Sequence, residues 1–317
     1  MPGSKLAADL WINEYITEYD IWQHGVEEIL FQGRTKYQQV HIVKSGPSGK
    51  ALVLDGKWQS DTGEEFIYHE PLVHVACVLH GGPKKILVLG GGEGATVREA
   101  LKWQCAEKVV MVDIDQEVVE ACVEHMPEMH QGCFDDPRCE LVFGDALHYL
   151  DESVGEWDVI ISDLSDPIEE GPSYALFTKE YFEKCKRALR PGGVFVVQAG
   201  PVAPKEMMLH VRLNKTVNAV FEEALSVTTQ TASYGSPWSY VIGADHALDR
   251  MPDPAAVDAL LAEKTTGKFV MFDGVSCLGL MCIGKHLREA IAAEQTVYTL
   301  ANPPKFFGKG VAEQGGG

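Results

Sequence analysis

Five short apolar runs alternate with helical segments between residues 85 and 198, and this alternation limits the possible folds more than any other feature of the chain. The runs occupy residues 85–89, 108–112, 139–143, 157–162 and 193–198. Each is largely apolar along its length, which is typical of a strand that is buried on both faces. Such strands, alternating with helices, predict an α/β fold in which helices cover both faces of a mostly parallel sheet.

A small antiparallel β-module is predicted for residues 1–66, ahead of this alternation. It begins with an irregular lead-in, and its strands are expected at residues 29–32, 37–43 and 51–54. The lead-in is expected at residues 11–18, and glycine and proline residues mark the turns between the strands. A module of this length buries little apolar surface by itself. We therefore expect it to pack against the larger domain or a second subunit, in a homodimer or homotetramer.

The larger domain is predicted over residues 67–305. A helix at residues 64–80 leads into it, and the chain after the fifth parallel strand predicts a helix at residues 204–220. An antiparallel strand pair and a further helix follow, and these are expected at residues 225–231, 239–243 and 255–263. Residues 306–317 are expected to be a disordered tail.

The charge balance of the chain limits its partners. Its 317 residues include 27 Lys and Arg but 46 Asp and Glu, which gives a formal net charge of −19. Phosphate groups would be repelled, so neither nucleic acid nor an anionic membrane is expected as a partner, whereas a cationic ligand is favoured. The chain has no apolar run of membrane-spanning length and no signal-peptide pattern, so we expect a cytoplasmic protein.

Cysteine and histidine residues do not follow a metal-binding pattern. The eight cysteines are scattered without a Cys-x-x-Cys pair, which indicates reduced thiols. His69, His74 and His80 are close together in the sequence, but their spacing does not match a zinc motif. We therefore expect no metal site.

An acidic loop follows the fourth apolar run. It reads Asp163-Leu-Ser-Asp-Pro-Ile-Glu-Glu-Gly-Pro172, and its carboxylates are those of Asp163, Asp166, Glu169 and Glu170. Its prolines and glycine exclude a helix. Taken alone, such a loop is more often a solvated acidic surface. This one starts where a buried strand ends, however, and ligands of open α/β sheets bind at that edge.

A glycine-rich loop, Gly90-Gly-Gly-Glu-Gly-Ala95, connects the first parallel strand to its helix. Gly90, Gly92 and Ala95 satisfy the dinucleotide-binding fingerprint. Glu93 argues against a dinucleotide, because its carboxylate would oppose a pyrophosphate at this helix N-terminus. A cationic nucleoside without phosphate fits better, and S-adenosylmethionine and its relatives are such ligands. Glu93 could instead only complement the helix macrodipole, but its place among glycines favours the pocket.

Acidic residues also follow the second and third strands. Asp113 ends the second strand, where a carboxylate commonly binds ribose hydroxyls. Asp145 ends the third strand and could bind an adenine amino group, cap the next helix, or both, whereas Asp115 is expected to be a helix cap. With Glu93 and Asp163, four consecutive strand ends carry an acid. This coincidence predicts one shared pocket that accepts positive charge.

Taken together, these motifs resemble those of the polyamine aminopropyltransferases, the spermidine and spermine synthase family. The resemblance runs from about residue 11 to about residue 245, and it rests on residues 37–38, 64–70, 90–94, 113–115, 144–146, 163–167 and 198–200. It implies that the β-module precedes a Rossmann-like, methyltransferase-type domain. It also implies transfer of an aminopropyl group to a cationic polyamine, with decarboxylated S-adenosylmethionine as co-substrate and no tightly bound cofactor.

The resemblance assigns roles to individual residues, among which Asp163 would be the catalytic base. The residues that would hold the donor are Gln38, Glu93, Asp113, Ile114, Asp145, Ala146 and Pro172. The residues that would bind the polyamine are Tyr68, His69, Glu93, Asp166, Glu169 and Tyr234. Taken singly, Gln38 could be a polar residue of an edge strand and His69 a satisfied helix histidine. The two tyrosines could be core or interface aromatics.

The acidic loop departs from the usual spermidine synthase pattern. Leu164 replaces the first serine of the usual Asp-Ser-Ser-Asp-Pro sequence, and Glu169 and Glu170 lengthen the loop. This pattern resembles plant-type thermospermine synthases, and the extra glutamates could pair with an additional ammonium group. We therefore expect spermidine as the acceptor and thermospermine as the product. Spermidine or spermine synthesis, or methyl transfer from S-adenosylmethionine, remain alternatives.

Overall fold

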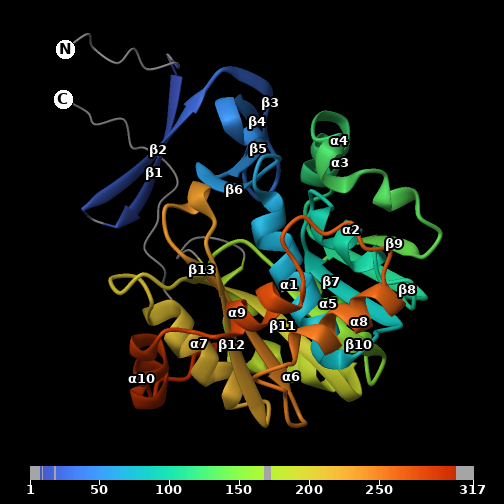
Figure 1. The fold of residues 1–317 in the computed structure, drawn as a ribbon. Coiled ribbons are helices and arrows are strands. Elements are labelled where there is room, and N and C mark those ends of the chain that lie inside the picture. The colour runs from blue at the N-terminus through green and yellow to red at the C-terminus, as the bar shows by residue number, and fades with distance from the viewer. Residues whose placement is uncertain (1–7, 9, 18, 168–172, 305–317) are drawn as a thin grey trace.

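The computed structural model describes residues 8, 10–17, 19–167 and 173–304, and it begins with two small antiparallel sheets (Figure 1). One has the strand order β1-β2 and the other the order β3-β4-β5-β6. The strands are β1 Leu10–Thr17, β2 Asp20–Val26, β3 Glu28–Arg34, β4 Gln39–Ser45, β5 Gly49–Leu54 and β6 Lys57–Asp61. The predicted tail at residues 306–317 lies outside the described residues.

The expected irregular lead-in at residues 11–18 is wrong for its described part, because these residues form β1 and pair with β2. Neither strand shows a clear alternation of apolar and polar residues, and pairing between the two decides the conformation. Strand β6 was also not expected. The β-rich character predicted for this region is confirmed.

The central sheet has seven strands, in the order β12-β13-β11-β10-β7-β8-β9. They are β7 Lys85–Gly90, β8 Lys108–Asp113, β9 Cys139–Phe143, β10 Trp157–Asp163, β11 Leu189–Pro201, β12 Glu223–Thr229 and β13 Trp238–Ala244. The five predicted apolar runs are its parallel strands, and the expected antiparallel pair is β12 with β13. The predicted α/β fold with a mostly parallel sheet is therefore confirmed.

Helices cover both faces of this sheet (Figure 1). They are α1 Glu65–His80, α2 Ala95–Leu101, α3 Gln116–His125, α4 Pro127–His130, α5 Ala146–Glu152, α6 Lys179–Ala188, α7 Met208–Asn218, α8 Pro254–Lys264, α9 Gly274–Met281 and α10 Lys285–Ala293. Along β7, Ile86 and Val88 belong to a core shared with α1, α2, α8 and α9. Leu87 and Leu89 belong to the opposite core, with α5, α6 and α7. Alternate side chains of one strand thus pack into two hydrophobic layers.

Helix α1 contains a proline in its interior, yet it continues for 16 residues. Pro71 has no N–H to donate to the carbonyl of Ile67, one turn earlier. The hydroxyl of Thr229 in β12 donates to that carbonyl instead, at 2.9 Å. Tyr240 in β13 donates its hydroxyl to the carbonyl of Tyr68 at 2.7 Å. Side chains of two strands therefore hold the first half of α1 in place.

The C-terminal part of the described chain also holds α1. The carboxylate of Glu70, a fully buried residue of α1, accepts hydrogen bonds from three consecutive backbone N–H groups. These belong to Val270, Met271 and Phe272, at 2.6, 2.8 and 2.9 Å. A buried carboxylate is stable only with such partners. Residues 270–272, for which the sequence suggests no role, thus anchor the helix that carries several predicted site residues.

Candidate active site

A cavity of about 240 Å³ opens at the carboxyl ends of β7, β8, β9 and β10. Residues of β1, β5 and β6 close it on the opposite side, so both β-regions contribute to its walls. Among the described residues, the acidic side chains that line it are Glu14, Asp55, Glu93, Asp113, Asp145, Asp163, Asp166 and Glu206. So many carboxylates around one cavity favour a ligand with several positive charges.

The glycine-rich loop lets β7 and β10 approach each other at the edge of the cavity. Gly90 has a φ of +82°, and a Cβ atom there would lie 2.2 Å from the backbone carbonyl oxygen of Asp163. A Cβ atom on Gly92 would lie 3.1 Å from the carboxylate of Asp113. Residues with side chains would therefore push the loop away from the two strand ends. The glycines keep this corner open for a ligand.

Asp163 is the last residue of β10, and two hydroxyl groups hold its carboxylate. Tyr68 of α1 donates to Oδ1 at 2.7 Å, and Thr96 of α2 donates to Oδ2 at 2.5 Å. Burial and then the charge of Glu93 raise the pKa of Asp163, against the opposing effects of His69 and the two hydroxyls. A carboxylate with a raised pKa accepts a proton more readily, as a general base must.

Glu93 and His69 form a buried pair beside Asp163. His69 Nε2 lies 3.0 Å from Glu93 Oε1, and its Nδ1 lies 3.0 Å from a carboxylate oxygen of Glu65. Burial alone would lower the pKa of His69, but the hydrogen bonds and charges of Glu65 and Glu93 outweigh it and raise this pKa to about 10. His69 is therefore an imidazolium near neutral pH.

The geometry of His69 also bears on metal binding. Within the described part of the chain, His69, Glu93 and Asp163 are the one group whose potential ligand atoms lie within 4.8 Å of one another. An imidazolium has no free lone pair, and both ring nitrogens of His69 already face carboxylates. This group is better suited to an ammonium ligand than to a metal ion.

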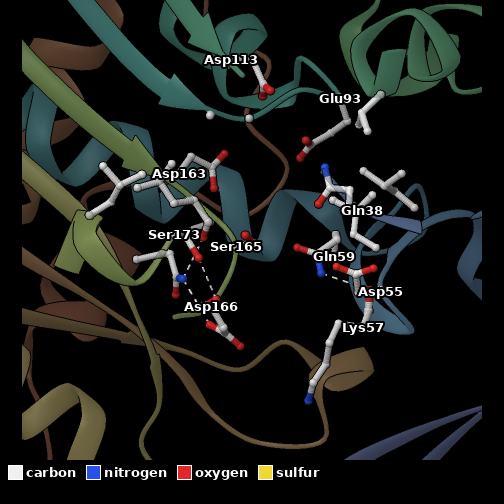
Figure 2. Close-up of a pocket in the computed structure, with 18 of the residues that line it drawn as sticks. Gln38, Asp55, Lys57, Gln59, Glu93, Asp113, Asp163, Ser165, Asp166 and Ser173 are labelled. Atoms are coloured by element: carbon white, nitrogen blue, oxygen red, sulfur yellow. Dashed lines mark hydrogen bonds between the residues drawn. The ribbon is translucent and has the colours of Figure 1, made fainter. Parts of the chain in front are cut away.

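The end of the cavity near β8 and β9 collects the residues predicted to hold a nucleoside (Figure 2). Burial, with the charges of Asp115 and Glu93 among its further causes, raises the pKa of Asp113 to about 6. Gln38 donates to Asp115 at 2.9 Å, which connects the N-terminal sheet to the loop after β8. Asp115 caps α3 as expected. Asp145 accepts from the backbone N–H of Leu147, which confirms the helix cap, and it also lines the cavity. Its contact with an adenine amino group stays a prediction.

The opposite end of the cavity is organised around Asp166 (Figure 2). Gln198 of β11 donates to Asp166 Oδ1 at 3.2 Å and to the carbonyl of Leu164 at 2.8 Å. Ser173 donates to the carbonyl of Asp166 at 2.9 Å. Burial raises the pKa of Asp166 to about 6, although the charge of Lys57 opposes it. The start of the acidic loop is therefore fixed from two directions.

Most of the predicted site residues line this one cavity. They are Gln38, Tyr68, Glu93, Asp113, Ile114, Asp145, Ala146, Asp163, Asp166 and Tyr234. His69 differs, because it is fully buried behind Glu93 instead of exposed along the expected polyamine path. Glu169 and Pro172 lie outside the described residues. Their roles, like those of the residues that line the cavity, stay predictions.

Five further residues complete the site, and none was given a role from the sequence. Thr96 and Gln198 hold Asp163 and Asp166, whereas Glu14, Lys57 and Glu206 line the cavity beyond Asp166. Thr96 directly follows the glycine-rich loop, and Gln198 ends an apolar strand, so their positions offered a signal. Glu14, Lys57 and Glu206 offered none, because tertiary contacts alone bring them to the cavity.

Two protein-family models match the chain, and together they span most of it. The model described as "Spermidine synthase tetramerisation domain" matches residues 10–61, and the "Spermine/spermidine synthase domain" matches residues 65–251. The second model begins where α1 begins, whereas the domain boundary predicted at residue 66 stays a prediction.

Known proteins resemble the chain over nearly its full length. A polyamine aminopropyltransferase of Synechococcus sp. (strain JA-3-3Ab) is 47% identical, over 93% of this chain and 97% of the relative. Thermospermine synthase ACAULIS5 of Arabidopsis thaliana is 36% identical, over 95% of this chain and 89% of the relative. A crystal structure of spermidine synthase in complex with the transition-state analogue AdoDATO has a TM-score of 0.82 and 28% identity, over 90% of this chain and 96% of that one.

Geometry and similarity lead to the same class of enzyme. Asp163, a carboxylate with a raised pKa, lies in a cavity lined by further carboxylates, which suits a polyamine ligand. The matching family models favour aminopropyl transfer over the alternative of methyl transfer. The chain belongs to the spermine/spermidine synthase family and is a polyamine aminopropyltransferase.

Proposed function

We propose that the enzyme transfers an aminopropyl group from decarboxylated S-adenosylmethionine to spermidine and releases thermospermine and methylthioadenosine. The observation that carries this proposal is the position of Asp163 between the two ends of a carboxylate-lined cavity. The resemblance of the acidic loop to plant-type thermospermine synthases and the 36% identity to one such enzyme support the choice of product.

The reaction is a direct displacement in which Asp163 accepts the proton. Polyamine nitrogens are protonated near neutral pH, so one must lose its proton before it can attack. The free nitrogen then forms a bond to the methylene carbon next to the sulfonium, and the carbon–sulfur bond breaks with its electron pair left on sulfur. Tyr68 and Thr96 hold the base in place. Alignment of nitrogen, carbon and sulfur is the main contribution of the site.

The donor lies at the end of the cavity near β8 and β9. Asp113 binds the ribose hydroxyls, and Gln38, Ile114, Asp145 and Ala146 surround the rest of the nucleoside. No tightly bound cofactor takes part in this reaction. Pro172 is assigned to the donor by resemblance.

The acceptor lies at the other end of the cavity, along Asp166, Tyr68 and Tyr234, with Glu169 assigned by resemblance. Glu93 binds the aminopropyl ammonium of the donor, and His69 supports it from behind. A carboxylate at this position also disfavours the donor that has kept its own carboxylate, because two anions would meet.

Composition supports a proposal for the location of the enzyme, and similarity supports one for its assembly. We place the enzyme in the cytoplasm, as the composition of the chain led us to expect. Among the described residues, no helix has the length and apolar character needed to cross a membrane. The match to a tetramerisation domain supports a homodimer or homotetramer assembled through the N-terminal strands. Size measurement in solution by light scattering tests the assembly.

Identification of the product tests the proposed function. The purified enzyme is supplied with decarboxylated S-adenosylmethionine and spermidine, and the products are separated against thermospermine and spermine standards. Thermospermine together with an equal amount of methylthioadenosine supports the proposal. Spermine as the product, or turnover of putrescine alone, would assign the enzyme to another member of the family, and S-adenosylhomocysteine formed from S-adenosylmethionine would indicate methyl transfer.

A further inference from the structure

One basic side chain stands among the acidic residues of the cavity. Lys57, the first residue of β6, is the only lysine or arginine among the described residues that line it. Only 7% of Lys57 is exposed. Figure 2 shows Lys57 and Asp166 toward one end of the cavity, with Asp113 and Glu93 toward the other. A buried cation in a site for cationic substrates is unexpected, because like charges repel.

Lys57 is held in place by β1. Its Nζ atom lies 3.4 Å from a carboxylate oxygen of Glu14 and donates to the carbonyl of Tyr15 at 3.2 Å. Glu14 is also buried, and its other carboxylate oxygen accepts from the backbone N–H of Trp58 at 3.3 Å. Both charges line the cavity. The ammonium group of Lys57 thus neutralises a carboxylate that an ammonium group of the substrate could otherwise reach.

The charge of Lys57 also acts on the carboxylates of Asp166 and Glu206, at the same end of the cavity. It opposes the burial that raises the pKa of Asp166 to about 6. Burial also raises the pKa of Glu206, and the hydrogen bond from Ser236, the charge of Lys205 and then that of Lys57 oppose this rise. Ser236 donates to Glu206 at 3.1 Å. Lys57 therefore compensates one of three negative charges and leaves two for the acceptor.

We propose that Lys57 limits the number of ammonium groups that the acceptor end can hold, and so excludes acceptors that carry one more charge. Its ammonium occupies the position beside Glu14 that the terminal ammonium of a longer polyamine would take. The inference rests on the proposed function and concerns the selectivity of the same site. Each turnover lengthens the acceptor by one aminopropyl unit and adds one amine. Lys57 therefore prevents the product from binding again as an acceptor.

Substitution of Lys57 by methionine tests this inference. Lys57→Met keeps most of the length of the side chain but removes the ammonium beside Glu14, which then has only the ring of His24, at 3.7 Å, as a basic neighbour. An acceptor with one more ammonium group therefore gains a partner. We expect the ratio of kcat/KM for a tetraamine to that for a triamine to rise about tenfold, with pentaamine formed. The matched control is Lys44→Met, an exposed lysine of β4 that pairs with Glu27, and it should leave the ratio unchanged.

Two further variants separate the effect of the Lys57 charge on acceptor choice from the effect of its side-chain shape. Glu14→Gln leaves Lys57 as an unpaired cation, so the ratio should fall below that of the wild type. Glu14→Gln combined with Lys57→Met removes both charges, so the ratio should return toward the wild-type value. A ratio that stays high in the double variant would show that side-chain shape, not charge, limits the acceptor. An unchanged ratio in both single variants, with circular dichroism showing that they are folded, would also overturn the inference.

Failure of the proposed function can be told apart from failure of this inference. If the wild-type enzyme makes spermine, or uses only a diamine, the proposed product is wrong. The same variants can then be compared with a triamine and a diamine, and Lys57→Met should still favour the acceptor with one more amine.

Discussion

Two fully buried histidines lie on opposite faces of the central sheet, and their pKa values move in opposite directions. His69 of α1 lies between Glu65 and Glu93, and their hydrogen bonds and charges outweigh its burial and raise its pKa to about 10. His210 of α7 lies 2.8 Å from the hydroxyl oxygens of both Ser226 and Ser239. Burial lowers its pKa to about 3.

This difference shows that burial alone does not decide the charge of a side chain. Desolvation disfavours the imidazolium at both positions, but only His69 has anionic partners to overcome it. Of the carboxylates around His69, that of Glu93 lines the cavity, whereas the hydroxyls around His210 belong to the core between α7 and the edge of the sheet. His69 therefore belongs to a charged network beside the cavity, and His210 belongs to a neutral network in the core on the other face of the sheet.

The largest expected effect tests whether the chemistry depends on the charged network. Asp163→Asn keeps the shape of the side chain but removes the proton acceptor, so kcat should fall by about a hundredfold or more. Binding of methylthioadenosine, measured by calorimetry, should stay close to that of the wild type. The control is Asp151→Asn, since Asp151 is half-exposed and pairs with Lys184 and Arg187 away from the cavity. Turnover near the wild-type rate in Asp163→Asn would exclude this residue as the base.

A smaller effect is expected for His69, which acts on the base through its charge. The positive charge of His69 opposes the rise in the pKa of Asp163. His69→Gln removes that charge, so the acidic limb of the pH profile of kcat/KM should move to higher pH. We expect kcat/KM near neutral pH to fall about tenfold. An unchanged pH profile would show that His69 only fills space.

The sequence predicts the charged network better than the neutral one. Asp113, Asp145 and Asp163 each end an apolar run, and parallel strands bring their carboxyl ends to one edge. Local patterns therefore identify both the sheet and its ligand edge. Nothing marks His210, because its partners Ser226 and Ser239 are distant in the chain and become neighbours only when β12 pairs with β13.

Long-range contacts also explain what the sequence does not reveal within the site. Lys57 directly follows the Asp55-Gly56 turn, a position at which a lysine side chain is usually exposed. It is buried beside Glu14 only because β1 pairs with β2 and packs against β6. Thr96 meets Asp163 only because β7 and β10 are neighbours. The helix predicted at residues 64–80 contains Pro71, and the sequence does not show that Thr229 satisfies the carbonyl that the proline leaves free.

The pH dependence of stability should distinguish the two histidines. The pKa of His69 is raised from 6.5 to about 10, so its stabilising effect is full below pH 6.5 and is lost as the pH rises to 10. The pKa of His210 is lowered from 6.5 to about 3, so the wild type loses stability as the pH falls from 6.5 to 3. Urea unfolding of the wild type, His69→Gln and His210→Gln between pH 3 and pH 10 measures the contribution of each histidine to the free energy of unfolding. Parallel pH curves for the three proteins would contradict the opposite charge states.

The smallest effect on catalysis is expected for His210→Gln, which tests the neutral network directly. His210 receives or donates one hydrogen bond at each ring nitrogen, and glutamine cannot reach both Ser226 and Ser239 in the same geometry. One buried hydrogen bond is lost, but Ser226 keeps its bond from Asn214 and Ser239 keeps its bond to the carbonyl of Gly200. Stability should therefore fall by about 0.5–1.5 kcal/mol. The rate per folded molecule and the pH profile of kcat/KM should match those of the wild type, because no side chain of this cluster lines the cavity among the described residues. A changed pH profile in folded His210→Gln would mean that the two faces of the sheet are coupled, and that the separation of a catalytic from a folding network does not hold.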